Sequence, residues 1–161
     1  MKRLFAITTV VVLCSALFSV VVYAGAEVQG SWSGKTYLTS NPCDGGQQFL
    51  AIGKGHLNLI GAGTWVSFGC LSGIFTTPVG IGSAIITTAT GDDLYLNIRI
   101  TFTYTGDRIG TWHQDEITVG GTGRFKGAQG VSSSDGFFNW LTEPGEPGVW
   151  NGTNTEGQIE F

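Results

Sequence analysis

The sequence predicts an all-β protein: a single antiparallel barrel of about eight strands that follows a signal peptide. Apolar residues recur at every second position in several segments, and no segment shows the three-and-four spacing of an amphipathic helix. Clusters of turn-forming residues separate these segments at hairpin spacing. Glycine, with 26 of the 161 residues, is frequent enough to supply the turns and bends of a closed barrel.

Residues 1–24 have the pattern of a secretory signal peptide. Lys2 and Arg3 precede an apolar run from Leu4 to Val22, and small residues follow at Ala24 and Ala26. We expect cleavage after Ala24, with Ala26 as the alternative, so that residues 25–161 form one β-barrel domain. The run is almost long enough for an uncleaved anchor, but its hydroxyl residues disfavour that alternative. The product would be secreted or periplasmic, with no stable membrane insertion after cleavage.

The mature chain is acidic. Loss of Lys2 and Arg3 takes the formal net charge from −4 to −6. An acidic domain with so few cations argues against nucleic acid as a partner.

Two cysteines, Cys43 and Cys70, remain after cleavage. Export would place them in an oxidising compartment, where such a pair usually bonds, so we predict a Cys43–Cys70 disulfide. Metal ligation or a catalytic thiol is disfavoured, because neither cysteine belongs to a C-x-x-C motif or has a neighbouring histidine.

The first expected strands run to the middle of the chain. They cover residues 31–38, 47–60, 64–70 and 83–90, with turns at 39–46 and 61–63. Gly53 and Gly55 interrupt the second of them and predict a bulge or bend. Residues 71–82 contain Pro78 and are expected to form a loop or a short edge segment.

The clearest strand is residues 94–104. Its apolar side chains alternate with polar ones and share one face: Leu94, Leu96, Ile98, Ile100, Phe102 and Tyr104. Further strands are expected at 111–119, 130–141 and 149–161, with turns at 91–93 and 105–108 and a loop at 142–148.

Residues 120–130 form the most distinctive segment, which we interpret as a structural corner of the barrel. Phe125 is expected to point inward and its neighbours Arg124 and Lys126 to be solvated. A phosphate-binding loop is disfavoured, because the segment lacks the third glycine of G-x-G-x-x-G and a Ser/Thr after Lys126. The corner residues are Gly120, Gly121, Gly123, Phe125, Gly127 and Gly130.

The same segment carries a resemblance to a known group. Its sequence GGTGRFKGAQG is similar to the GGTGRFxGAxG segment of bacterial exported proteins related to the allene oxide cyclase and dirigent barrels. Shorter stretches that resemble the group are found at 55–57, 90–95, 117–119 and 156–159. The resemblance implies the barrel fold of that group. No catalytic residue is carried over from it, because none of those known in these enzymes falls on a matching motif here.

The candidate catalytic residues are His113, Asp115 and Glu116. If Ile117 and Val119 face the barrel interior, strand alternation places His113 and Asp115 there as well. A neutral imidazole beside a carboxylate could then act as acid and base. The alternative is that these residues form an exposed hairpin end.

The candidate ligand-binding residues are His56, Trp65 and Trp112. His56 either lines the cavity or is a structural residue near a strand bend. The tryptophans form either a stacking wall for a ligand or core and rim packing: Trp32, Trp65, Trp112, Trp140 and Trp150. With only His56 and His113 available, neither a metal site nor a cofactor is expected.

Three functions are compatible with this sequence. The leading one is an exported, non-catalytic barrel that binds a small apolar or amphipathic ligand, or acts through its surface. The second is an isomerase or cyclase that acts by confinement of its substrate, which the resemblance to allene oxide cyclases implies. The third is a small outer-membrane barrel, suggested by the apolar C-terminal residues Ile159 and Phe161. The sequence leaves open whether the barrel interior is filled or hollow.

Overall fold

The structure is a computed structural model that describes residues 25–73, 77–140 and 146–161. The expected signal peptide lies outside the described residues. The strands are β1 (Ala26–Glu27), β2 (Gly30–Cys43), β3 (Gly46–Leu57), β4 (Gly61–Ser72), β5 (Val79–Thr88), β6 (Asp93–Gly106), β7 (Ile109–Gly121), β8 (Gln129–Asn139) and β9 (Gly148–Glu160), and a short 3₁₀-helix, η1 (Gly123–Phe125), follows β7. No helix in this described part is long and apolar enough to cross a membrane.

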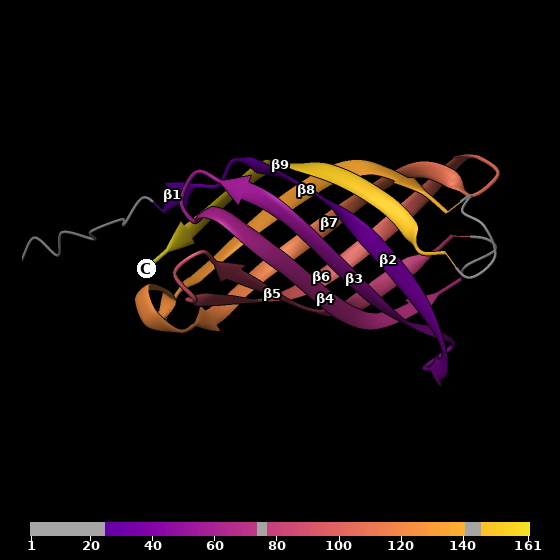
Figure 1. Cartoon of the computed structure of the whole chain (residues 1–161), viewed down its shortest axis with the longest axis horizontal. Helices are drawn as coiled ribbons and strands as arrows, with labels where there is room; N and C mark the ends of the chain where they lie inside the picture. The colour runs from indigo at the N-terminus through magenta and orange to yellow at the C-terminus, as the bar shows by residue number, and fades with distance from the viewer. Residues whose placement is uncertain (1–24, 74–76, 141–145) are drawn as a thin grey trace, which may run out of the picture.

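The strands close into an antiparallel barrel. Each strand from β2 to β9 pairs with the next in chain order, and β9 also pairs with β2, so eight strands form a ring. The short β1 adds to the edge of β9. Figure 1 shows the strands wound obliquely around the long axis, with η1 and the C-terminus at one end. The predicted fold class is therefore confirmed.

Strands β2, β4, β6 and β7 are longer than the sequence predicts, whereas β3 ends at Leu57 instead of residue 60. Residues 39–43 belong to β2, which pairs with β3 through an irregularity between Leu38 and Pro42. Both ends of the expected loop 71–82 are strand, because β4 continues to Ser72 and β5 begins at Val79; residues 74–76 lie outside the described residues. The turn expected at 61–63 lies at residues 58–60 instead, and Gly61 is the first residue of β4.

Strand β6 has the predicted alternation. Its inner face carries Leu94, Leu96 and Ile98, which are buried, whereas Asn97 and Arg99 on the outer face are exposed. The apolar residues pack into the core of the barrel, as hydrophobic burial requires.

The glycine-rich corner closes one end of the barrel. Phe125 on η1 is 1% exposed, and its ring packs 5.7 Å from that of Phe161. Arg124 is half exposed but donates a 2.7 Å hydrogen bond to the carbonyl of Ile60, in the turn between β3 and β4. Gly120, Gly123 and Gly127 have φ values of 131°, 51° and 82°, which favour glycine. The corner is thus structural, with Phe125 inward and Lys126 exposed as predicted.

The opposite end carries the predicted disulfide. Cys43 at the end of β2 is bonded to Cys70 on β4, which closes a loop with a sequence separation of 27 residues. The bond links two strands that do not pair directly, since β3 lies between them.

Loss of this disulfide is expected to destabilise the barrel by about 3.5 kcal/mol, because the unfolded chain regains the entropy of an open loop of that length. Urea unfolding of the wild type and of the Cys43→Ser/Cys70→Ser variant measures the difference. Equal unfolding midpoints would show that the cross-link contributes nothing.

Candidate functional site

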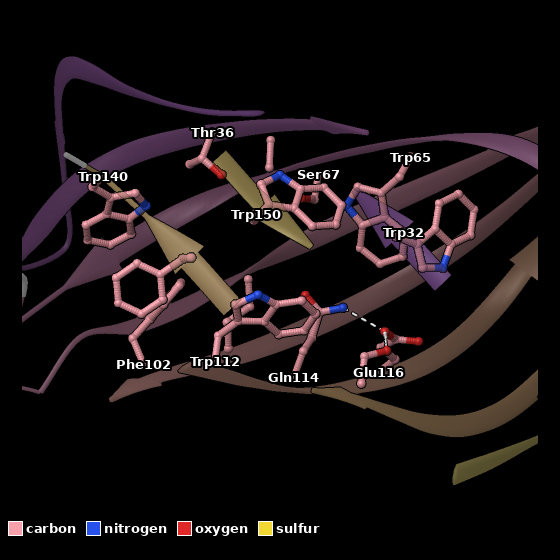
Figure 2. A pocket seen from close by; sticks show the side chains of 14 residues that line it. Trp32, Thr36, Trp65, Ser67, Phe102, Trp112, Gln114, Glu116, Trp140 and Trp150 are labelled. Carbon is pink, nitrogen blue, oxygen red and sulfur yellow. Dashed lines mark hydrogen bonds between the residues drawn. The ribbon is translucent and has the colours of Figure 1, made fainter. Parts of the chain in front are cut away.

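The barrel interior contains a cavity of about 50 Å³. Figure 2 shows it as an elongated space, with Phe102 and Trp140 at one end and Trp32, Trp65 and Glu116 at the other. All five tryptophans of the chain contribute to it. The lining residues are Trp32, Thr36, Ala51, Trp65, Ser67, Ile100, Phe102, Trp112, Gln114, Glu116, Ser134, Phe138, Trp140 and Trp150.

The tryptophan rings occupy space that only glycine can leave free. A Cβ atom at Gly136 or Gly152 would lie closer than 3.0 Å to the ring of Trp112. The same holds for Gly55 with Trp32, and for Gly34 and Gly53 with Trp150. Each ring therefore lies against neighbouring backbone instead of filling the centre of the barrel.

This packing corrects the interpretation of Gly53 and Gly55. The register of β3 with β2 and with β4 is continuous through both residues, so neither forms a bulge. Their role is to accommodate the indoles of Trp150 and Trp32.

The rings meet at steep angles instead of stacking in parallel. Trp32 and Trp65 have centroids 5.7 Å apart and planes inclined by 57°. Trp112 and Trp150 form a T-shaped pair at 6.2 Å and 80°. In such pairs the two rings do not stack face to face.

One carboxylate lies in this aromatic cavity. Glu116 on β7 is 4% exposed and accepts hydrogen bonds from Gln114 Nε2 at 2.7 Å, from Ser134 Oγ at 2.8 Å and from Ser132 Oγ. All three donors are neutral. Among the described lining residues, Glu116 is the only one with a titratable side chain. The candidate Glu116 thus lies inside the barrel.

The other two catalytic candidates do not. Ile117 and Val119 are 54% and 53% exposed on the outer wall, and the alternation of β7 places His113 and Asp115 there with them. The inner face of β7 instead carries Trp112, Gln114 and Glu116. Of the two alternatives, the inward placement of His113 and Asp115 is therefore wrong: both are exposed, although they lie within β7 and not at a hairpin end. It assumed that apolar residues point inward, whereas Ile117 pairs with the equally exposed Val131 on the outside.

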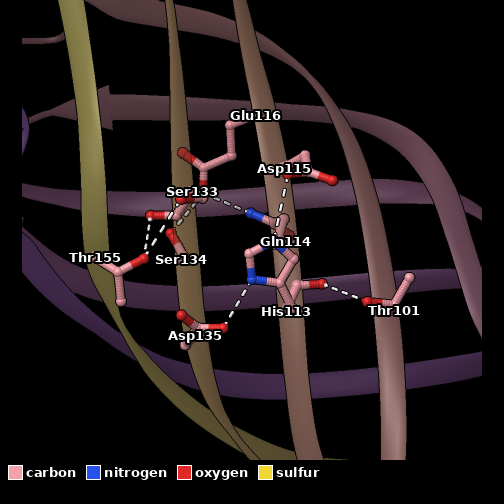
Figure 3. Close-up of polar contacts among 9 residues, drawn as sticks. All are labelled: Thr101, His113, Gln114, Asp115, Glu116, Ser133, Ser134, Asp135 and Thr155. Atoms are coloured by element: carbon pink, nitrogen blue, oxygen red, sulfur yellow. Dashed lines mark hydrogen bonds and ion pairs between the residues drawn. The ribbon is translucent and has the colours of Figure 1, made fainter.

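On the outer wall His113 lies between two carboxylates (Figure 3). Its Nδ1 is 2.8 Å from Asp135 on β8, and its Nε2 is 3.3 Å from Asp115. The hydrogen bond with Asp135 raises the pKa of His113 above its ordinary value of 6.5, partial desolvation opposes this, and Asp115 adds to the rise. In the described part of the chain, no three or more histidine, cysteine, aspartate or glutamate side chains are arranged so that they could hold a metal ion together.

Of the three ligand-binding candidates, two lie inside the barrel and one lies outside. Trp65 and Trp112 line the cavity, whereas His56 is exposed on β3 and is not among the lining residues. Sequence reasoning missed the polar lining of Gln114, Ser67 and Ser134. Part of this lining could have been predicted from Trp112. If Trp112 points inward, strand alternation makes the residues two and four positions later, Gln114 and Glu116, point inward as well.

One polar group of the cavity wall lacks a protein partner. The Nε1 atom of Trp150 is fully buried and has no hydrogen bond to any described residue. By contrast, Trp112 Nε1 donates to the carbonyl of Phe137 at 3.2 Å. A buried donor without a partner is unfavourable, so this end of Trp150 is a polar defect in the wall.

Comparisons with known proteins assign no family. No family model matches the chain, and no curated protein matches it. Among solved structures, the chain is similar to a pterocarpan synthase dirigent protein, with 9% sequence identity and a TM-score of 0.46 over 86% of this chain and 87% of that one.

Substitution of Gly136 by alanine is expected to destabilise the barrel by about 1 to 3 kcal/mol, because the new methyl group would overlap both the carbonyl of Asn151 and the ring of Trp112. Urea unfolding measures the effect. Gly106→Ala is the matched control, since a Cβ there meets no atom within 4 Å, and its effect should stay within about 0.5 kcal/mol. Equal losses in the two variants would contradict the packing role of Gly136.

The pair of His113 and Asp135 is expected to stabilise the fold in acid. Because the folded pKa is raised above 6.5, the contribution is complete below that pH and is lost as the pH rises through the folded value. NMR titration of the His113 ring should show a lower pKa in Asp135→Asn and a smaller decrease in Asp115→Asn. Equal shifts, or none, would contradict the dominant role of Asp135.

Proposed function

We propose that this protein is an exported β-barrel that binds a small amphipathic molecule in its interior. The observation that carries the proposal is the cavity itself, whose wall combines five tryptophans with one buried carboxylate. Binding sites for small molecules are typically apolar and aromatic, with a few polar groups that fix orientation. Glu116, with Gln114 and Ser134 bonded to it, would provide those polar groups.

The size of the cavity restricts the ligand. One water molecule needs about 10 to 15 Å³ of such space, so a cavity of about 50 Å³ suits a compact small molecule. Long acyl chains and multi-ring compounds would require rearrangement of the tryptophans. Small ligands therefore fit this interior better than lipids.

Export is supported by the Cys43–Cys70 disulfide, because such bonds persist in oxidising compartments. The basic and apolar pattern of residues 1–24 agrees with it. We propose a secreted or periplasmic location, and a place in the group of bacterial exported barrels that the sequence resembles.

A confinement isomerase or cyclase is the second candidate, and Glu116 is the observation that favours it. A carboxylate inside an aromatic cavity could take a proton from an enclosed substrate and return it at another position. Gln114 and Ser134 would hold the carboxylate in place during both transfers.

An outer-membrane barrel is less well supported. The outer wall carries charged side chains on adjacent strands, with Arg99 opposite Asp115 and His113 opposite Asp135. Charges on the lipid-facing side of a barrel strand are costly, so this wall suits an aqueous surface.

The test is to identify what the protein carries. Natively purified protein is denatured, extracted and analysed by mass spectrometry, alongside a Ser67→Leu variant. Ser67 is 1% exposed and lines the cavity, so leucine there should fill the space and remove the bound compound. Ser83→Leu on the outer face of the neighbouring β5 is the matched control and should retain it.

Two outcomes would contradict the proposal: repeated absence of any compound from the wild type, or equal recovery from all three proteins. Incubation of the extracted compound with the wild type separates the binder from the enzyme. A binder returns it unchanged, whereas an isomerase converts it and loses that conversion in Glu116→Gln.

A further inference from the structure

We infer that the cavity selects an organic cation, such as a methylated ammonium group, held between the tryptophan rings and the carboxylate of Glu116. The inference rests on the proposed binding in the barrel interior and adds the chemical class of the ligand. Two independent features of the cavity point to a positive charge.

The first feature is a buried carboxylate without a counter-ion. Glu116 receives hydrogen bonds from one amide and two hydroxyl groups, and none of the three donors is charged. The ion pairs in the described part of the chain join His113 with Asp115, His113 with Asp135 and Arg124 with Asp92, and none includes Glu116. A carboxylate in such surroundings keeps a strong field that a cation can neutralise.

The second feature is the aromatic wall. Tryptophan binds cations more strongly through its ring face than any other aromatic side chain. Trp32 and Trp65 lie at the same end of the cavity as Glu116 in Figure 2, and their rings are tilted rather than stacked. A cation at this end would meet both aromatic faces and the carboxylate.

The remaining lining excludes a bare metal ion as the partner of Glu116. Calcium needs six to eight oxygen ligands and magnesium a near-ideal octahedron. The cavity offers one carboxylate, and no metal-binding group of three or more side chains occurs among the described residues. Apolar wall atoms suit methyl groups around a nitrogen much better than a hydrated ion.

The experiment compares choline with 3,3-dimethylbutan-1-ol, which has the same shape but carbon in place of the charged nitrogen. Quenching of the cavity tryptophans and calorimetry both report binding. We expect choline to bind the wild type at least about tenfold more tightly than the neutral alcohol.

Glu116→Gln keeps the size of the side chain and removes its charge. It should weaken choline binding by about tenfold or more and change the binding of the alcohol by less than about threefold. Asp135→Asn makes the same change of charge on the outer wall and should leave both ligands unaffected. If Glu116→Gln does not fold, Trp65→Phe tests the aromatic half, with choline binding weakened by about threefold or more.

Equal binding of choline and the alcohol would overturn the cation inference and leave binding in the interior standing. Loss of choline binding in Asp135→Asn as large as in Glu116→Gln would also overturn it, because the effect would then be one of overall charge. If neither compound binds, the inference falls. The proposed function falls with it only if native extracts also contain no bound compound.

Discussion

The contact between tryptophan rings and glycine backbone is the constraint on which the interior depends. A barrel of eight strands is just wide enough for its side chains to fill it, so five indoles directed inward would ordinarily leave no room. Here glycines lie beside four of the five indoles, and rings such as those of Trp112 and Trp150 lie against the backbone of the wall. The cavity exists because these glycines lack a Cβ atom and let the rings lie close to the backbone. A methyl group at Gly152 or Gly34 would push a ring towards the centre.

Strand β7 reverses the usual pattern of burial, in which apolar side chains point inward and polar ones outward. It directs Gln114 and Glu116 inward and leaves Ile117 in water, where Ile117 pairs with Val131 across the outer surface. The inward polar groups are tolerable because β8 lies alongside and presents Ser132 and Ser134 to the carboxylate. The network also restricts the rotamer of Glu116, so the charge is held in one position relative to the aromatic wall.

The sequence was sufficient to predict the features that depend on local patterns. Alternation on β6, the buried Phe125 of the corner and the Cys43–Cys70 disulfide follow from spacing and from the chemistry of export. The inward face of β7 could not be predicted in this way, because the pairing of Glu116 with serines on β8 is a contact between strands. For the same reason Gly53 suggested a bulge, since its contact with Trp150 joins residues almost a hundred positions apart.

A rigid wall and a fixed charge select ligands in different ways. The aromatic wall is positioned by backbone contacts, so it adapts little and selects by size. The carboxylate is surrounded by neutral donors that neither repel a cation nor neutralise the negative charge, so in the proposed role it would select by sign. Both groups are organised before any ligand arrives, which lowers the entropy lost on binding. In the proposed role, a small cavity of this kind would therefore discriminate among ligands of the same shape, which a barrel lined by apolar groups alone would not do.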